Sequence, residues 1–169
     1  MVAGDDDAPP EARPAGLDDL VFLCRALNEA GARYVVIGGM AIIEAGFVRA
    51  TEDIDLLVEA SPQNLARVRT AMMALPDGAV RDVADGDLDA YVVVRVADEF
   101  VVDLMKAACG VEYERARHFI NWVEIEGVSI PFANVDLLWE TKQTVREKDR
   151  LDRHFLESLR ANRGDDETS

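Results

Sequence analysis

Two aspartates separated by one residue, Asp53 and Asp55, lie at the start of a short apolar run that ends at Val58. Side chains of a strand alternate between its faces, so both carboxylates would point to the same side. Their mutual repulsion next to apolar neighbours favours a bound cation, and hard cations such as Mg²⁺ choose oxygen ligands. An Asp-x-Asp that stands alone is more often a solvated strand end, so the interpretation depends on other residues.

The pair Gly38-Gly39 is the second element of the candidate site. It ends the β-branched run of residues 34–37 and opens a short predicted helix. A strand-to-helix turn without Cβ atoms lets backbone N–H groups approach a phosphate, and a helix N-terminus favours an anion. The alternative is a plain tight turn.

Asp103 is the third element, because it interrupts the otherwise apolar run of residues 100–105. An ionised carboxylate inside a buried strand is costly unless it is paired or bound to a metal. The pattern therefore predicts either a third metal ligand or an ion pair of Asp103 with Lys106 or an arginine.

The combination resembles the nucleotidyltransferase superfamily with the polymerase-beta-type fold. That signature is an apolar strand, a Gly-Gly or Gly-Ser turn, a gap of roughly a dozen residues, Asp-x-Asp and a third Asp on a later strand; here thirteen residues separate Gly39 from Asp53. Small bacterial AbiEii-like proteins are the subgroup that the chain is most similar to. They share the Arg-x-Thr-x-Asp-Ile-Asp form, here Arg49 to Asp55, and a helical Lys followed by Lys/Arg-Asp-x-x-Asp, here Lys142 and residues 148–152.

The resemblance, which covers about residues 20–160, implies an enzyme that moves a nucleoside monophosphate from an NTP such as ATP to an acceptor hydroxyl. It implies two Mg²⁺ ions, or Mn²⁺, held by Asp53, Asp55 and Asp103. Asp103 would also help to activate the acceptor oxygen, as in other two-metal sites of phosphoryl transfer.

The same resemblance implies a set of nucleotide-binding residues. Gly38 and Gly39 would surround the β- and γ-phosphates, and Lys142 would offset the negative charge of the triphosphate. Arg49 and Thr51 would contact the phosphate or orient the loop before the aspartates. Arg49 has the alternative of a surface loop charge. For Asp149 and Asp152 we expect capping of the helix or pairing along it rather than metal binding.

Composition narrows the function classes. The 169 residues carry a net charge of −15, which disfavours nonspecific binding to nucleic acid but permits a metal-bridged nucleotide. No apolar run is long enough to cross a bilayer, the N-terminus does not resemble a secretory signal, and the two cysteines suggest no disulfide framework. We therefore expect a cytoplasmic protein without a membrane partner.

The periodicity of apolar residues predicts the elements that must position these side chains. Strands are expected at 34–37, 54–58, 90–96, 100–105, 122–125 and 128–132, and helices at 17–30, 40–45, 62–74, 111–117, from 134 or 136 through 142, and onward to about 159. This order indicates an α/β (α+β) fold with a single mixed sheet flanked by helices and with C-terminal helices. Residues 75–89 are expected to be mostly loop.

We expect three regions: a disordered acidic arm at 1–16, a nucleotidyltransferase-like domain at 17–161 and a disordered acidic tail at 162–169.

The main functional hypothesis is the Mg²⁺-dependent enzyme, as one half of a toxin–antitoxin pair, with a protein, a tRNA or a small molecule as acceptor. A cognate protein or a second copy in a homodimer could complete the acceptor site. Because the chain is small and has Gly39 where many active members have Ser, the second hypothesis is a noncatalytic nucleotide- or partner-binding module. A weaker third is an acidic partner for a basic protein.

Overall fold

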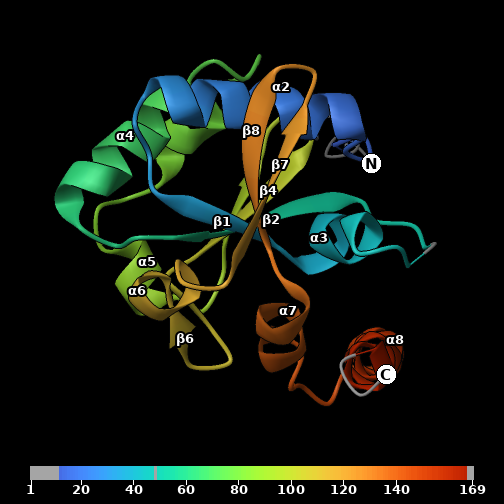
Figure 1. The fold of residues 1–169 in the computed structure, drawn as a ribbon. Helices are drawn as coiled ribbons and strands as arrows, with labels where there is room; N and C mark the ends of the chain where they lie inside the picture. Colours follow the sequence, from blue (N-terminus) through green and yellow to red (C-terminus); the bar gives the residue numbers. More distant parts are fainter. Residues whose placement is uncertain (1–11, 48, 167–169) are drawn as a thin grey trace, which may run out of the picture.

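A six-stranded mixed sheet forms the centre of the protein in a computed structural model that describes residues 12–47 and 49–166 (Figure 1). The strand order is β3-β4-β2-β1-β8-β7. The strands are Tyr34–Ile37 (β1), Asp53–Val58 (β2), Val94–Ala97 (β3), Val101–Met105 (β4), Ile120–Ile125 (β7) and Val128–Ala133 (β8). A separate small hairpin pairs Ala107–Ala108 (β5) with Val111–Glu112 (β6). The predicted fold class, one mixed sheet flanked by helices, is confirmed.

The pairing of the strands is both parallel and antiparallel. β1 runs antiparallel to β2 and parallel to β8, and β2 runs parallel to β4. β3–β4 and β7–β8 are antiparallel hairpins, so β3 and β7 form the two edges. The helices are Leu17–Glu29 (α2), Gly38–Glu44 (α3), Pro62–Met72 (α4), Asp87–Ala90 (α5), Tyr113–Ala116 (α6), Val135–Thr141 (α7) and Glu147–Asp166 (α8), with a 3₁₀ turn at Ala79–Asp82 (η1).

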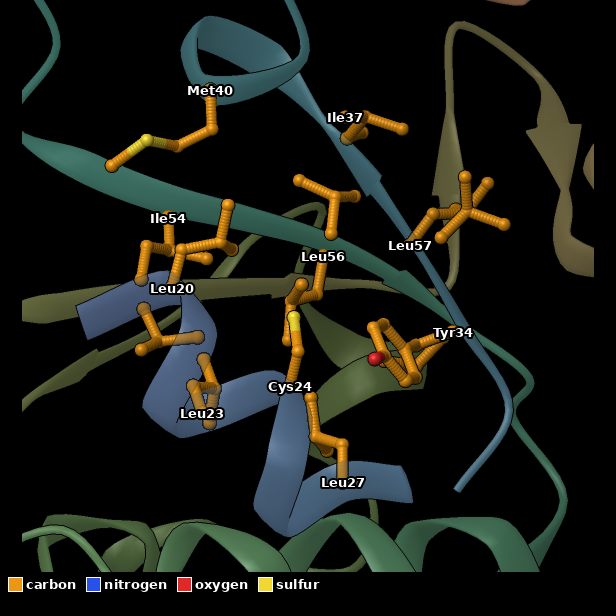
Figure 2. Packing of buried hydrophobic residues seen from close by; sticks show 14 of the residues in the cluster. Leu20, Leu23, Cys24, Leu27, Tyr34, Ile37, Met40, Ile54, Leu56 and Leu57 are labelled. Carbon is orange, nitrogen blue, oxygen red and sulfur yellow. The ribbon is translucent and has the colours of Figure 1, made fainter. Parts of the chain in front are cut away.

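Helices α2 and α4 pack together on one face of the sheet (Figure 1). Leu20, Leu23 and Leu27 of α2 recur at helical spacing and are fully buried. Ile54 and Leu56 of β2 meet this layer (Figure 2). Each such buried aliphatic side chain contributes about 2 kcal/mol of hydrophobic stabilisation. The core therefore holds β2 by the face that carries Ile54 and Leu56, while Asp53 and Asp55 point to the opposite face of the strand, where Leu57 is also buried.

Two predicted helix starts have the expected caps. The Ser61 side chain accepts a hydrogen bond from the Asn64 N–H, and Pro62 occupies the first helical position of α4. At α7 the choice between two caps is decided for Asn134, whose side chain accepts the Leu137 N–H.

Helices α3, α7 and α8 lie on the other side of the sheet from α2 (Figure 1). α3 packs on β1, β2 and α7, and α7 packs on α8. The C-terminal helices thus reach the same region as the face of β2 that carries the aspartates.

Several boundaries differ from the predictions. Residues 75–89 contain η1 and α5, and the expected helix at 111–117 is split between β6 and α6. β3 begins at Val94, because its pairing with β4 begins there, opposite Leu104, and Tyr91 to Val93 are exposed. Helix α8 continues past the predicted end at about residue 159 to Asp166, and Arg160 and Arg163 in this part form ion pairs with Asp136 of α7.

The predicted ends are also shifted where the structure describes them. In the expected arm, the Ala15 N–H donates to the Glu52 carbonyl, and Arg13 forms ion pairs with Asp19 and Glu99. Residues 1–11 of the arm and 167–169 of the tail lie outside the described residues, while 162–166 belong to α8. None of the described helices has both the length and the apolar character needed to span a membrane.

Candidate active site

A row of neighbouring residues crosses four strands on the face of the sheet opposite α2. Asp55 of β2 lies opposite Ile37 of β1 and opposite Asp103 of β4, and Asp103 lies opposite Arg95 of β3. Residues directly opposite each other in a sheet share a face, and Asp53 shares that face by its spacing from Asp55. The three carboxylates predicted as metal ligands are therefore brought to one surface by the strand register.

Arg95 bridges two of these carboxylates. Its Nε lies 3.0 Å from Asp103 Oδ1, and its Nη2 lies 3.1 Å from both Asp103 Oδ2 and Asp53 Oδ2. Of the two partners considered for Asp103, an arginine is correct and Lys106 is wrong. Lys106 lies three positions further along the chain, toward the opposite face, and pairs with Asp89 at 2.8 Å.

Gly38 makes room for Asp55. Gly38 has a φ of +69°, and a Cβ at this position would lie 2.7 Å from Asp55 Cγ, which is too close for a real contact. The second glycine is buried beneath the loop that leads into β2, because a Cβ at Gly39 would lie 2.7 Å from Thr51 Cβ. Gly38 thus makes room for an aspartate and Gly39 for the loop before β2; the phosphate contacts implied by the resemblance stay a prediction.

The negative charges of the three carboxylates repel one another. Burial, and then repulsion by Asp103, raise the pKa of Asp55 to about 6, although Lys142 acts in the opposite direction. Burial and Asp103 also raise the pKa of Asp53, while the Arg95 guanidinium partly offsets the effect. Two nearby carboxylates with raised pKa values are stabilised in their charged form by a cation.

Lys142 lies at the end of α7 and is held by two buried carboxylates of α8. Its Nζ is 3.1 Å from Asp149 Oδ1 and 3.0 Å from Asp152 Oδ2. Burial works to raise the pKa of Asp149, but hydrogen bonds from Thr144 and Lys142, with Arg146, hold that pKa below its usual value. Asp149 and Asp152 are paired, but their shared partner is Lys142 at the end of α7 rather than a residue along their own helix, so the expected pairing along the helix is wrong for this contact.

Arg49 joins the same network from the loop before β2. Its Nε is 3.0 Å from Asp152 Oδ1, and its Nη2 donates to Asp152 Oδ2 at 3.1 Å. The alternative of a solvent-exposed loop charge is therefore wrong, because the side chain is only 17% exposed. Asp152 links this loop to α8 and to Lys142.

A cavity of about 400 Å³ connects the carboxylates to these basic residues. Asp53, Asp55 and Asp103 line one part of it, and Arg146 and Lys148 near the start of α8 line another, together with Gly38, Arg49, Thr51, Arg95 and Lys142. Gly39 is not among the lining residues. The volume is in the range of small-molecule sites. Within the residues that the structure describes, no three or more His, Cys, Asp or Glu side chains stand ready to hold a metal.

Arg95, Arg146 and Lys148 are cavity residues that the sequence reasoning missed. Arg95 interrupts an apolar run, residues 92–97, as Asp103 interrupts its own strand. The same rule, that a charge in a buried strand needs a partner, could have singled it out. Lys148 begins the Lys-Asp-x-x-Asp stretch of the resemblance, which gave it no role of its own, and no comparable signal marks Arg146.

Comparison with solved structures supports the assignment of the fold. A Thermotoga maritima protein provisionally described as a nucleotidyltransferase superimposes with a TM-score of 0.55, over 88% of this chain and 92% of that chain. The chain has a nucleotidyltransferase-like fold. Sequence identity to that protein is 15%, so the likeness concerns the fold. No protein-family model matches the chain, and no curated protein sequence matches it.

Proposed function

We propose that the cavity binds a nucleoside triphosphate with a divalent cation and transfers its nucleoside monophosphate to an acceptor hydroxyl. The observation that carries the proposal is the convergence of Asp53, Asp55 and Asp103 on one cavity whose other lining residues include Arg146 and Lys148. Carboxylates suit the cation, and basic side chains suit the phosphates. The nucleotidyltransferase-like fold supports the same reaction class.

The oxygen donors of the three carboxylates suit Mg²⁺ or Mn²⁺ by their chemistry, although the side chains, as they lie while Arg95 engages them, form no ready-made metal cluster within the described residues. The carboxylates offer hard oxygen donors, and the raised pKa values of Asp53 and Asp55 indicate a deficit of positive charge. Asp53 and Asp103 are engaged by the Arg95 guanidinium, which supplies positive charge at the same oxygens. When bound, the cation would neutralise the triphosphate and stabilise the attacking and leaving oxygens.

The chain's own residues would position the reactants and handle the proton. Arg146 and Lys148 would bind the phosphates, with Lys142 contributing charge from its buried position. The acceptor oxygen forms a bond to the α-phosphorus as the bond to pyrophosphate breaks. Asp103 would receive the proton of the acceptor hydroxyl, as the resemblance implies.

A transfer assay tests this function. The protein is incubated with Mg²⁺, α-labelled NTPs and a bacterial extract, and both the labelled product and pyrophosphate are measured. We expect Asp53→Asn and Asp103→Asn to reduce transfer by at least about a hundredfold, because each removes a charged ligand. Asp82→Asn is the matched control, since Asp82 is exposed and does not line the cavity. Equal transfer by all variants would refute the site.

The alternative function is a binding module without turnover. It is favoured by one observation: the glycine turn is backed by Asp55 and Thr51 rather than left open. Calorimetry with Mg²⁺ and each NTP separates the two functions when it is combined with the pyrophosphate assay. Binding without pyrophosphate release would support the module, and the absence of binding would contradict both.

For the biological role we propose a toxin–antitoxin component, with a protein, tRNA or small molecule as acceptor and a cognate protein or second copy as partner. Growth arrest on expression, relieved by Asp103→Asn, would support a toxin. The labelled product of the extract assay identifies the acceptor class by its sensitivity to protease or ribonuclease.

A further inference from the structure

The side chain of Arg95 occupies the position where a cation is needed. We propose that Arg95 is a built-in counter-ion that holds the carboxylates while the site is empty and leaves them when the metal binds. The proposal rests on the proposed function, since it concerns how the same site is loaded. It makes Arg95 a residue that regulates metal affinity rather than a metal ligand.

The strand register places Arg95 for this role. Arg95 lies directly opposite Asp103, and its guanidinium forms two contacts with that carboxylate, at 3.0 and 3.1 Å. The contact with Asp53 Oδ2, at 3.1 Å, spans from β3 across β4 to β2. A planar guanidinium with several donors can bridge two carboxylates, whereas an ammonium acts as a point charge.

The surroundings of Arg95 permit it to leave. β3 is an edge strand, and the Arg95 side chain is 61% exposed, so solvent can take up the guanidinium when it moves. An ion pair with one such exposed partner is easier to break than a fully buried pair. Asp103, in contrast, is buried on its strand, so its carboxylate stays in place when the guanidinium moves. The exchange of one cation for another therefore requires movement of a single exposed side chain.

A side chain that competes for the metal's oxygen ligands affects metal binding more than a nearby charge does. If Arg95 and the metal use the same oxygens, removing Arg95 tightens metal binding by more than the loss of one positive charge alone. Lys148 provides the comparison: it lines the same cavity and acts on Asp53 and Asp55 through its charge, but forms no hydrogen bond to either.

The test measures Mn²⁺ binding to the full-length protein by electron paramagnetic resonance, without nucleotide. We expect Arg95→Met to tighten the dissociation constant about tenfold, because the two ion pairs of Arg95, with Asp53 and Asp103, no longer compete. Lys148→Met should tighten it about two- to threefold through charge alone. Arg95→Lys should lie between Arg95→Met and the wild type, since it keeps the charge but loses the bridge.

Thermal unfolding provides an independent readout. Metal-free Arg95→Met should melt below the wild type, because its carboxylates have lost their counter-ion, and added Mn²⁺ should raise its Tm by more than that of the wild type. If Arg95→Met fails to fold, Arg95→Lys carries the comparison.

The outcomes separate the two proposals. Equal tightening by Arg95→Met and Lys148→Met would overturn the counter-ion role while leaving the metal site intact. If Mn²⁺ binding is absent in the wild type and both Arg95 variants, or is unaffected by Asp53→Asn, the proposed function itself fails.

Discussion

Replacing Lys142 by methionine should destabilise the protein strongly, even though the substitution nearly preserves side-chain length. The Lys142 Nζ lies within 3.1 Å of Asp149 and Asp152, whose side chains are fully buried. Breaking a buried ion pair by removing one partner costs about 3–5 kcal/mol, because the remaining charge is left uncompensated.

The remaining partners reduce the expected loss. Asp149 keeps its contacts with Thr144 and Arg146, and Asp152 keeps Arg49. We therefore expect the free energy of unfolding to fall by about 3 kcal/mol, at the lower end of that range. Such a loss is a large part of the stability of a typical domain.

Urea denaturation at neutral pH measures this loss, with Lys148→Met as the control. Lys148 is exposed and pairs with no carboxylate within the described residues, so its replacement should change stability by less than about 0.5 kcal/mol. A loss below about 1 kcal/mol for Lys142→Met would refute the structural role of the network. An intact fold with strongly weakened NTP binding would instead favour the triphosphate role.

Three further predictions concern the supports of the site. Gly38→Ala should lower the free energy of unfolding by about 2 kcal/mol or more in urea titrations, because Gly38 has a positive φ and the new Cβ would overlap with Asp55. Gly86→Ala is the control, since there is open space around Gly86. The pKa of Asp55 is raised to about 6 in the folded protein, so its charged form is disfavoured, and the contribution of Asp55 to metal-free stability should rise by about 2 kcal/mol as pH falls from 7 to 4. Asp55→Asn should remove this contribution, measured as the difference between the pH profiles of the variant and the wild type; parallel profiles would contradict the raised pKa. Asp98→Ala should cost about 2 kcal/mol by calorimetry, because Asp98 accepts the N–H groups of Asp77, Ala79 and Glu99; an unchanged Tm would argue against this anchor.

The local pattern predicted much of the fold. Helical spacing in α2, the cap at Ser61 and the β-branched run of β1 reflect interactions between residues close in sequence, so they can be read without knowing the fold. The predicted boundaries were less accurate for β3 and α8. The start of β3 depends on its pairing with β4, and the last part of α8 contacts α7 through ion pairs. Such contacts join residues that are far apart along the chain.

The carboxylate site likewise depends partly on local sequence and partly on contacts between distant residues. The sequence by itself determined that Asp53 and Asp55 share a face, since strand alternation is a local property. Only the tertiary structure decided that Asp103 lies opposite Asp55, that Arg95 bridges the carboxylates and that Lys142 is enclosed by α8. Strand register and helix packing follow from the whole core, and ion pairs form between whichever charges that packing brings together.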